Sequence, residues 1–222
     1  MSSCPLHTTE PLKQGCHAQV KRGRKRAHYD RQLAYTIMDE ALVAYMGMQM
    51  DGQPFVLPTS HWRAGDRVYW HAALKGRMGG GIVGQPVCLT FALLDGLVLA
   101  RSAFHHSVNY RSLMLFGKPE MVTDPQEKAR QLQNLIEKVA PGRWSKLRPM
   151  TEQEVAITGV LSMPIDEGSI KMRSDPPVDE PEDYDWPVWA GVVPLQTRLG
   201  EPQACPKLNA GLEPPNVMDW SS

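Results

Sequence analysis

The sequence has few cysteines, no long hydrophobic run and no surplus of charge of either sign. Its four cysteines, Cys4, Cys16, Cys88 and Cys205, form no C-x-x-C pair, which argues against a disulfide framework and against a zinc site. No stretch reaches the roughly 20 apolar residues that a transmembrane helix needs. The first residues also lack the apolar core of a signal peptide. We therefore expect a cytoplasmic protein with no membrane partner.

The balance of charge excludes a second class of protein. Lysine and arginine together number 24, aspartate and glutamate also number 24, and the formal net charge is zero. Because nucleic-acid binders depend on a surplus of positive charge, we expect no nucleic-acid partner. A small anionic ligand stays open, since it needs only a local cluster of cations. The 222 residues, 42% of them hydrophobic, fit one globular domain with a proper core.

Composition divides the chain into three parts. Residues 1–25 are polar and lead into the basic run Lys21-Arg22-Gly23-Arg24-Lys25-Arg26. We interpret this part as a disordered, solvated lead-in, with a localisation signal or a nucleic-acid contact as the alternative. Residues 26–199 form the folded domain. Residues 200–222, rich in proline and small side chains, are expected to form a loose tail.

Within the domain, short strand-like runs alternate with turn signals. We expect strands over residues 41–50, 55–57, 68–70, 87–94, 112–116, 154–163 and 188–195. The dipeptides Asp51-Gly52 and Asp95-Gly96 predict tight turns between neighbouring strands. Helices are expected to begin after Asp30 and after Asp124, both good N-caps. Residues 175–185, dense in proline and acid, are expected to be a surface loop. The fold class is therefore mainly β, an antiparallel sheet closing toward a barrel with flanking helices.

A G-x-G-x-x-G sequence at Gly79, Gly81 and Gly84 does not predict a dinucleotide-binding fold. In such a fold the glycines open a helix that receives a pyrophosphate. Here Gln85-Pro86 and a predicted strand follow the last glycine, so no crossover helix has room to form.

Three segments carry residues that fit a ligand site. Pro58, within a strand, predicts an edge position, where the hydroxyls of Thr59 and Ser60 are free to meet a ligand. After the strand that holds His71, Lys75 and Arg77 flank a glycine, a pattern that suits a phosphate but also describes two solvated cations in a turn. The third segment, Tyr110-Arg111-Ser112, precedes an apolar strand and fits either a pocket wall or an exposed hairpin.

The order of these segments resembles the pyridoxamine 5′-phosphate oxidase-like, FMN-binding split barrels, and within them the nitroimidazole-reductase-type branch. The resemblance runs from about residue 26 to about residue 195. It implies an antiparallel split β-barrel that forms a homodimer, with FMN at the subunit interface. It places the flavin phosphate on Lys75 and Arg77. It lays the ring and ribityl chain along the remaining candidate residues: Pro58, Thr59, Ser60 and His71, with Tyr110, Arg111 and Ser112 nearby.

The resemblance leaves the function open among three classes. The first is an FMN-dependent oxidoreductase acting on a small organic molecule, nitro-like, quinone-like or pyridoxal-like, with NADH or NADPH as reductant and His71 as the catalytic residue. The second is a non-catalytic flavin carrier or sensor. The third is a haem-binding split barrel. We expect no metal site: His105 and His106 are adjacent, so in a strand they point to opposite faces.

Overall fold

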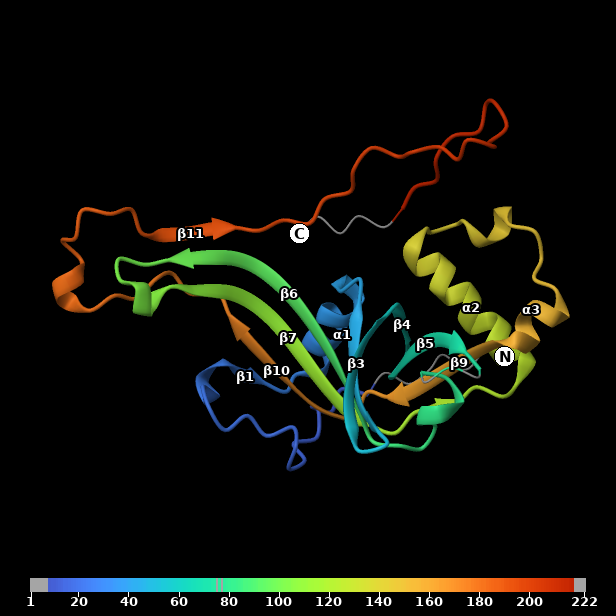
Figure 1. Ribbon diagram of the computed structural model, residues 1–222, viewed down its shortest axis with the longest axis horizontal. Helices are drawn as coiled ribbons and strands as arrows, with labels where there is room; N and C mark the ends of the chain where they lie inside the picture. The colour runs from blue at the N-terminus through green and yellow to red at the C-terminus, as the bar shows by residue number, and fades with distance from the viewer. Residues whose placement is uncertain (1–7, 75, 77, 218–222) are drawn as a thin grey trace.

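Two antiparallel sheets make up most of the protein. The computed structural model describes residues 8–74, 76 and 78–217. The larger sheet has the strand order β1-β10-β7-β6-β2-β3, with β11 paired to β6, and the smaller has the order β4-β5-β9-β8. No pairing among the described strands joins the two sheets into one closed barrel. The expected split-barrel class is confirmed in this form: two sheets with helices beside them (Figure 1).

The elements follow one another along the chain with short connections. The strands are β1 (Ala27–His28), β2 (Ala44–Met50), β3 (Gln53–Thr59), β4 (His61–Ala64), β5 (Arg67–Ala73), β6 (Val87–Leu99), β7 (Ser107–Gly117), β8 (Glu120–Met121), β9 (Thr158–Pro164), β10 (Glu167–Arg173) and β11 (Gly191–Pro194). The α-helices are α1 (Arg31–Glu40), α2 (Pro125–Val139) and α3 (Glu152–Ile157). Short 3₁₀ turns lie at Arg24–Arg26, Gly80–Ile82, Ala103–His105, Trp144–Lys146 and Pro181–Asp183.

Local signals explain where the first two helices begin. The carboxylate of Asp30 accepts a hydrogen bond from the backbone N–H of Leu33, 2.7 Å away. That of Asp124 accepts from two N–H groups in the first turn of α2. Each carboxylate thereby satisfies donors that the helix leaves free. Both expected caps are confirmed.

The turn between β2 and β3 also follows from its residues. Asp51 has φ 50° and Gly52 has φ 76°, both in the left-handed region. This pair of positive values is that of the tight hairpin turn that an Asp-Gly dipeptide favours. The predicted turn is confirmed, and it makes β3 the edge strand of the larger sheet.

Two predicted elements are wrong. Asp95-Gly96 does not end a strand: β6 runs on to Leu99, with an irregularity in its pairing to β7 between Leu94 and Gly96. An Asp-Gly pair serves equally in a bulge, where one strand carries an extra residue. Residues 154–163 are not one strand, because α3 precedes β9. A capping box formed by Thr151 and Glu154 starts this helix.

The region of the three glycines holds no crossover helix. Among the described residues between β5 and β6, the one helical element is the 3₁₀ turn Gly80–Ile82, and the two strands belong to different sheets. The exclusion of a dinucleotide-binding βαβ unit is confirmed.

The core lies between the two sheets and α1. Its largest buried members, all at most 1% exposed, include Ile37, Met38, Trp70, Leu89 and Leu115. A second cluster lies where α2 packs on the smaller sheet, around Trp62, Tyr69, Leu132 and Val160. None of the described helices is long and apolar enough to cross a membrane.

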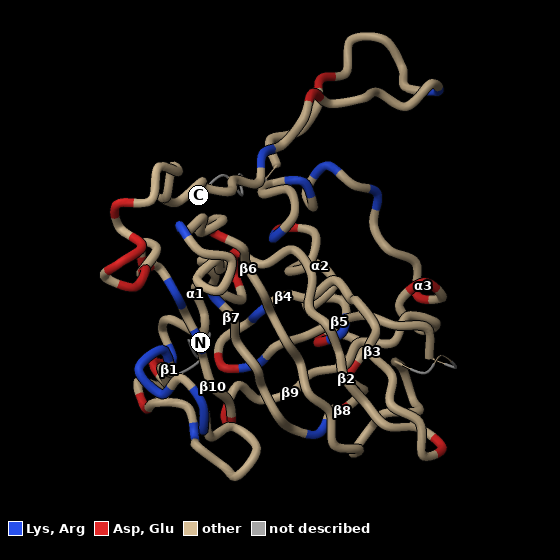
Figure 2. Tube along the Cα trace, turned by 60° about the vertical axis from the view of Figure 1, so that its left-hand side comes forward, with Lys and Arg blue, Asp and Glu red and all other residues tan. Residues whose placement is uncertain are grey.

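The two ends of the described chain differ. Near the start, Leu12 is buried and its N–H donates to the carbonyl of Tyr29, so this part packs on the domain. Beyond β11 the chain is exposed and projects away from the sheets (Figure 1). Figure 2 shows basic and acidic residues interspersed along most of the trace, apart from the basic turn next to β1 and the acidic stretch of residues 175–185.

Candidate functional site

A groove of about 510 Å³ lies where the chain passes from the larger sheet to the smaller one. On one side β3 ends and Ser60 links it to β4, and on the other side β5 ends. We call this cavity the groove. It is lined by Leu57, Pro58, Thr59, Ser60, His71, Ala72, Ala73, Gly76 and Met78.

The residues of β3 suit a ligand site because β3 is an edge strand. Pro58 lacks a backbone N–H, and an edge position tolerates this loss since no further strand must be bonded there. The hydroxyl of Thr59 makes only a local contact, to the carbonyl of Ser60 at 3.2 Å. The hydroxyls of Thr59 and of Ser60, which both line the groove, are therefore placed to exchange hydrogen bonds with a molecule in it.

His71 enters the groove from β5. It lies opposite Val160 of β9 and is exposed. Within the described part of the chain its imidazole has no hydrogen-bond or ion-pair partner. The ring is therefore free to contact a ligand through either nitrogen.

The two expected phosphate-binding cations, Lys75 and Arg77, lie outside the described residues. Gly76 between them lines the groove, and its N–H donates to the carbonyl of Ala73 at 2.8 Å.

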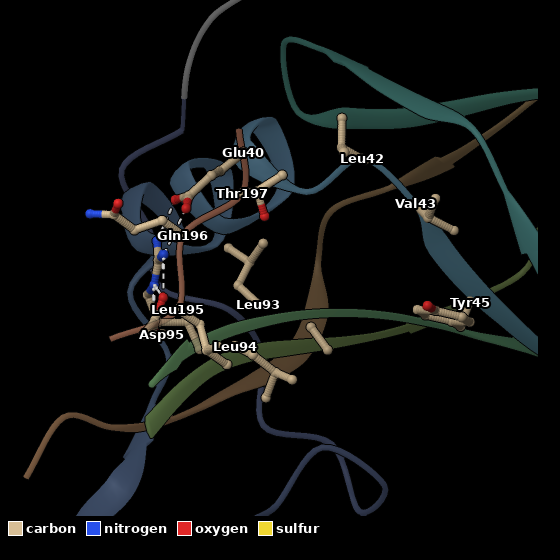
Figure 3. A pocket seen from close by; sticks show the side chains of 12 residues that line it. Glu40, Leu42, Val43, Tyr45, Leu93, Leu94, Asp95, Leu195, Gln196 and Thr197 are labelled. Carbon is tan, nitrogen blue, oxygen red and sulfur yellow. Dashed lines mark hydrogen bonds and ion pairs between the residues drawn. The ribbon is translucent and has the colours of Figure 1, made fainter. Parts of the chain in front are cut away.

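A second cavity, of about 470 Å³, lies between the end of α1, strand β6 and the segment that follows β11. We call it the Arg111 pocket. Figure 3 shows Glu40 and Asp95 at one end of it and Tyr45 at the other. It is lined by Glu40, Leu42, Val43, Tyr45, Ala92, Leu93, Leu94, Asp95, Arg111, Leu195, Gln196 and Thr197.

Arg111 is held by two carboxylates within this pocket. Its Nη2 lies 2.6 Å from Oε1 of Glu40 and 2.7 Å from Oδ1 of Asp95, its Nε also donates to Asp95, and its Nη1 donates to Glu40. The hydrogen bonds to Glu40 and then to Asp95 raise the pKa of Arg111 above its usual value. All three guanidinium nitrogens thus donate to carboxylates.

Comparison with known proteins places the chain in a family. The family model described as pyridoxamine 5′-phosphate oxidase matches residues 30–172. The chain belongs to this family. No curated protein matches the chain closely enough to count as a relative.

Two solved structures are similar over nearly the whole chain. The flavocytochrome Anf3 from Azotobacter vinelandii is 41% identical, with a TM-score of 0.87, covering 92% of this chain and 96% of that one. The FAD and haem binding protein from Mycobacterium smegmatis is 31% identical, with a TM-score of 0.84, covering 89% of this chain and 100% of that one.

A third structure agrees in fold alone. It is described as a 5-nitroimidazole antibiotic resistance protein, from Bacteroides thetaiotaomicron, and is 24% identical with a TM-score of 0.51. The match covers 65% of this chain and 86% of the chain of that structure.

In this member of the pyridoxamine 5′-phosphate oxidase family, the predicted site residues fall into separate places. The groove brings together four of them: Pro58, Thr59, Ser60 and His71. Tyr110, Arg111 and Ser112, expected near the flavin, do not line the groove of their own chain. Arg111 lines the second cavity, while Ser112 donates from Oγ to the carbonyl of Lys171 at 3.0 Å and Tyr110 lies on β7 opposite Leu94.

The sequence analysis missed the partners of Arg111. Glu40 ends α1 and Asp95 lies at the irregular point of β6, so no spacing in the sequence links them to position 111. The strand assumed for the two adjacent histidines is wrong: His105 ends a 3₁₀ turn and His106 follows it, so they do not alternate across a sheet. They have different partners. His105 lies 3.4 Å from Glu180, and Nδ1 of His106 is 2.9 Å from the carbonyl of Ser102. The described residues contain no group of three metal-ligating side chains.

Proposed function

We propose that this protein is a flavoprotein that binds its flavin in the groove and transfers electrons to or from a small organic molecule. The observation that carries this proposal is the similarity, over nearly the whole chain, to two proteins whose names include a flavin or FAD and a haem or cytochrome. A flavin supplies the redox chemistry when bound, and the protein supplies binding, orientation and electrostatics.

The groove has the features that a flavin requires. Its volume suits a ring system of that size, and Leu57 and Pro58 give it an apolar side. The hydroxyls of Thr59 and Ser60 provide donors and acceptors, and the free imidazole of His71 provides one more. Lys75 and Arg77 stand on either side of Gly76 in the sequence, and the family resemblance assigns the flavin phosphate to them.

The identity of the flavin is tested by extraction. We propose FMN, which needs only the one phosphate site at Lys75 and Arg77, although the name of the Mycobacterium smegmatis relative specifies FAD. Acid release of the cofactor followed by mass spectrometry distinguishes the two. We expect Arg77→Ala to weaken flavin binding at least tenfold, because a charged bidentate contact to the phosphate is lost.

Haem is the second candidate ligand, because the name of one relative includes haem and that of the other includes cytochrome. A haem iron is held in proteins by histidine, cysteine, methionine or tyrosine. His71 and Met78 both line the groove, and His71 has no other partner within the described part of the chain. The visible spectrum of the purified protein separates the candidates: two flavin bands support the first, and a Soret band supports haem. If His71 ligates iron, His71→Ala removes the Soret band and leaves any flavin bands unchanged.

Catalysis is a further part of the proposal, with NADH or NADPH as reductant and His71 as the catalytic residue. Rapid mixing of the flavin-loaded protein with each nicotinamide would bleach the flavin bands of a reductase. In a carrier or sensor that nicotinamides do not reduce, the flavin bands would stay unchanged. Unchanged turnover in His71→Ala with flavin still bound would remove His71 from the reaction.

The proposal includes a homodimer. Val56 and Met114 lie on the larger sheet outside the Arg111 pocket and are 66% and 40% exposed, which leaves apolar side chains there for a second copy to cover. Tyr110 of the partner subunit would then reach a groove that its own chain does not offer, whereas Arg111 stays held by Glu40 and Asp95 of its own chain. Light scattering on the purified protein measures the mass directly.

A cytoplasmic location fits the described cysteines, Cys16, Cys88 and Cys205, which are all unpaired.

A further inference from the structure

The groove and the Arg111 pocket are neighbours on one face of the larger sheet. Tyr45, which lines the pocket, is the register partner of Pro58, which lines the groove, across the pairing of β2 with β3. Directly opposite residues in antiparallel strands point to the same face, with Cβ atoms about 4.5–5.5 Å apart. Both residues are exposed. The two cavities therefore adjoin at this pair of residues, which places a molecule in the pocket beside a cofactor in the groove.

Most of the pocket wall is apolar and open to solvent. Leu42, Val43, Tyr45, Leu94 and Leu195 all line it, and between 37% and 60% of each residue is exposed. Burying such side chains against an apolar ligand is favourable, at about 25 cal/mol for each Å² removed from water. The volume of about 470 Å³ lies within the range of small-molecule sites.

The polar end of the pocket determines the charge of the ligand. Arg111 brings one positive charge, and Glu40 and Asp95 bring two negative charges, so this end carries a net charge of −1. Each nitrogen of Arg111 already donates to these carboxylates, which leaves no free guanidinium fork for an anion. The carboxylate oxygens retain lone pairs that can accept further hydrogen bonds. A phosphate or carboxylate would be repelled, whereas an ammonium group would be attracted.

We propose that the Arg111 pocket is the substrate site of this protein and takes an apolar organic molecule with a cationic amino group. The role as substrate site rests on the proposed function, because it requires a redox cofactor in the neighbouring groove. The amino group lies at Glu40 and Asp95, and the apolar body lies along the leucines toward Tyr45 and the groove. Phosphorylated pyridoxal-like compounds are excluded from this site by their charge.

A matched pair of compounds tests the charge preference. 3-Phenylpropylamine and 4-phenylbutyrate share one phenylpropyl body and carry opposite charges at pH 7. Calorimetric titration of the full-length protein should show the amine binding about tenfold more tightly, because its charge is attracted to the net negative end of the pocket and that of the carboxylate is repelled. Asp95→Asn should lower this preference about tenfold. The control Asp51→Asn makes the same change of charge at the β2–β3 turn, outside the pocket, and should leave the preference unchanged.

The visible spectrum of the bound cofactor tests the link to the groove. The amine should shift this spectrum in the wild type, at the same concentrations at which it binds. Equal affinity for both compounds, or an equal preference in the two variants, would overturn the amine site. Selective binding with no spectral shift would overturn its role as substrate site. A colourless protein would instead overturn the proposed function and the substrate role with it, while calorimetry would still decide whether the pocket binds amines.

Discussion

The amine of Lys138 lies 3.2 Å from Nε2 of His61, at a place where the end of α1 meets α2 and the smaller sheet. His61 is 2% exposed, and its Nε2 is 2.7 Å from the carbonyl of Met38. Its Nδ1 is buried without a hydrogen-bond partner among the described residues. Burial, followed by the nearby charge of Lys138, lowers the pKa of His61 to about 3. His61 is therefore neutral in the folded protein above about pH 3, and it takes up a proton when the protein unfolds in acid.

We expect His61 to make the protein sensitive to acid. Because the pKa of His61 is lower in the folded state than in the unfolded state, the unfolded state binds more protons between pH 6.5 and about 3. The free energy of unfolding should fall through this window as pH falls, by up to about 1.4 kcal/mol per pH unit. In His61→Gln this part of the loss should disappear. Urea unfolding at several pH values measures it, with the exposed His28→Gln as the control. Parallel curves for wild type and His61→Gln would contradict the prediction.

The lowered pKa of Lys138 should affect the free energy of unfolding at alkaline pH. Burial lowers its pKa to about 8, while its Nζ lies 3.3 Å from the carbonyl of His61 and 3.4 Å from that of Met38. The unfolded state then binds more protons between pH 8 and 10.5, so wild-type stability should rise with pH there, relative to Lys138→Met. Methionine keeps the apolar stem and removes the titrating group. The difference between the two unfolding curves is the measured quantity, and a difference that stays constant from pH 8 to 10.5 would rule out the lowered pKa.

The sequence predicted the features that depend on neighbouring residues and missed those that depend on the fold. Asp30, Asp124 and the Asp51-Gly52 turn act within a few residues of themselves, and each has its expected place. The Asp95-Gly96 pair also has local turn chemistry, but pairing with β7 continues past it, so tertiary contacts decided the outcome. The missed helix α3 had a local signal, Thr151 three residues before Glu154, which the apolar residues that follow obscured.

The same division holds for the candidate site. Pro58, Thr59 and Ser60 share the groove with His71 because the chain crosses between the sheets at Ser60, and the family resemblance had already grouped them. Arg111 was expected to serve a flavin. Its carboxylate partners come from α1 and from β6, 71 and 16 residues away along the chain. Contacts at such separations are set by strand register and helix packing, which the local pattern does not contain.

Removing Arg111 should destabilise the protein, because the carboxylates of Glu40 and Asp95 would then repel each other without a positive charge between them. The Arg111 side chain is 20% exposed, and those of Glu40 and Asp95 are 22% and 32% exposed. We expect Arg111→Met to cost about 2 kcal/mol at pH 7, less than the roughly 3–5 kcal/mol of a fully buried pair, because water screens these charges in part. Arg130→Met, which removes a 68% exposed partner of Glu127, is the control and should stay within about 0.5 kcal/mol of wild type. Equal costs for the two variants would show that the cluster contributes nothing specific.

Gly168 allows β10 to lie close to β7. A Cβ atom added at this position would lie 2.5 Å from the carbonyl oxygen of Met114 and 2.8 Å from Cδ2 of Leu115. The first of these is a backbone atom, so the strands themselves would have to separate. We expect Gly168→Ala to lower the free energy of unfolding by about 1–3 kcal/mol, or by about 2–4 °C in Tm for each kcal/mol. Gly200→Ala is the matched control, because no atom lies within 4 Å of its added Cβ and it should leave Tm almost unchanged. If thermal unfolding shows the same Tm for both variants, the close approach of β10 to β7 does not require glycine at position 168.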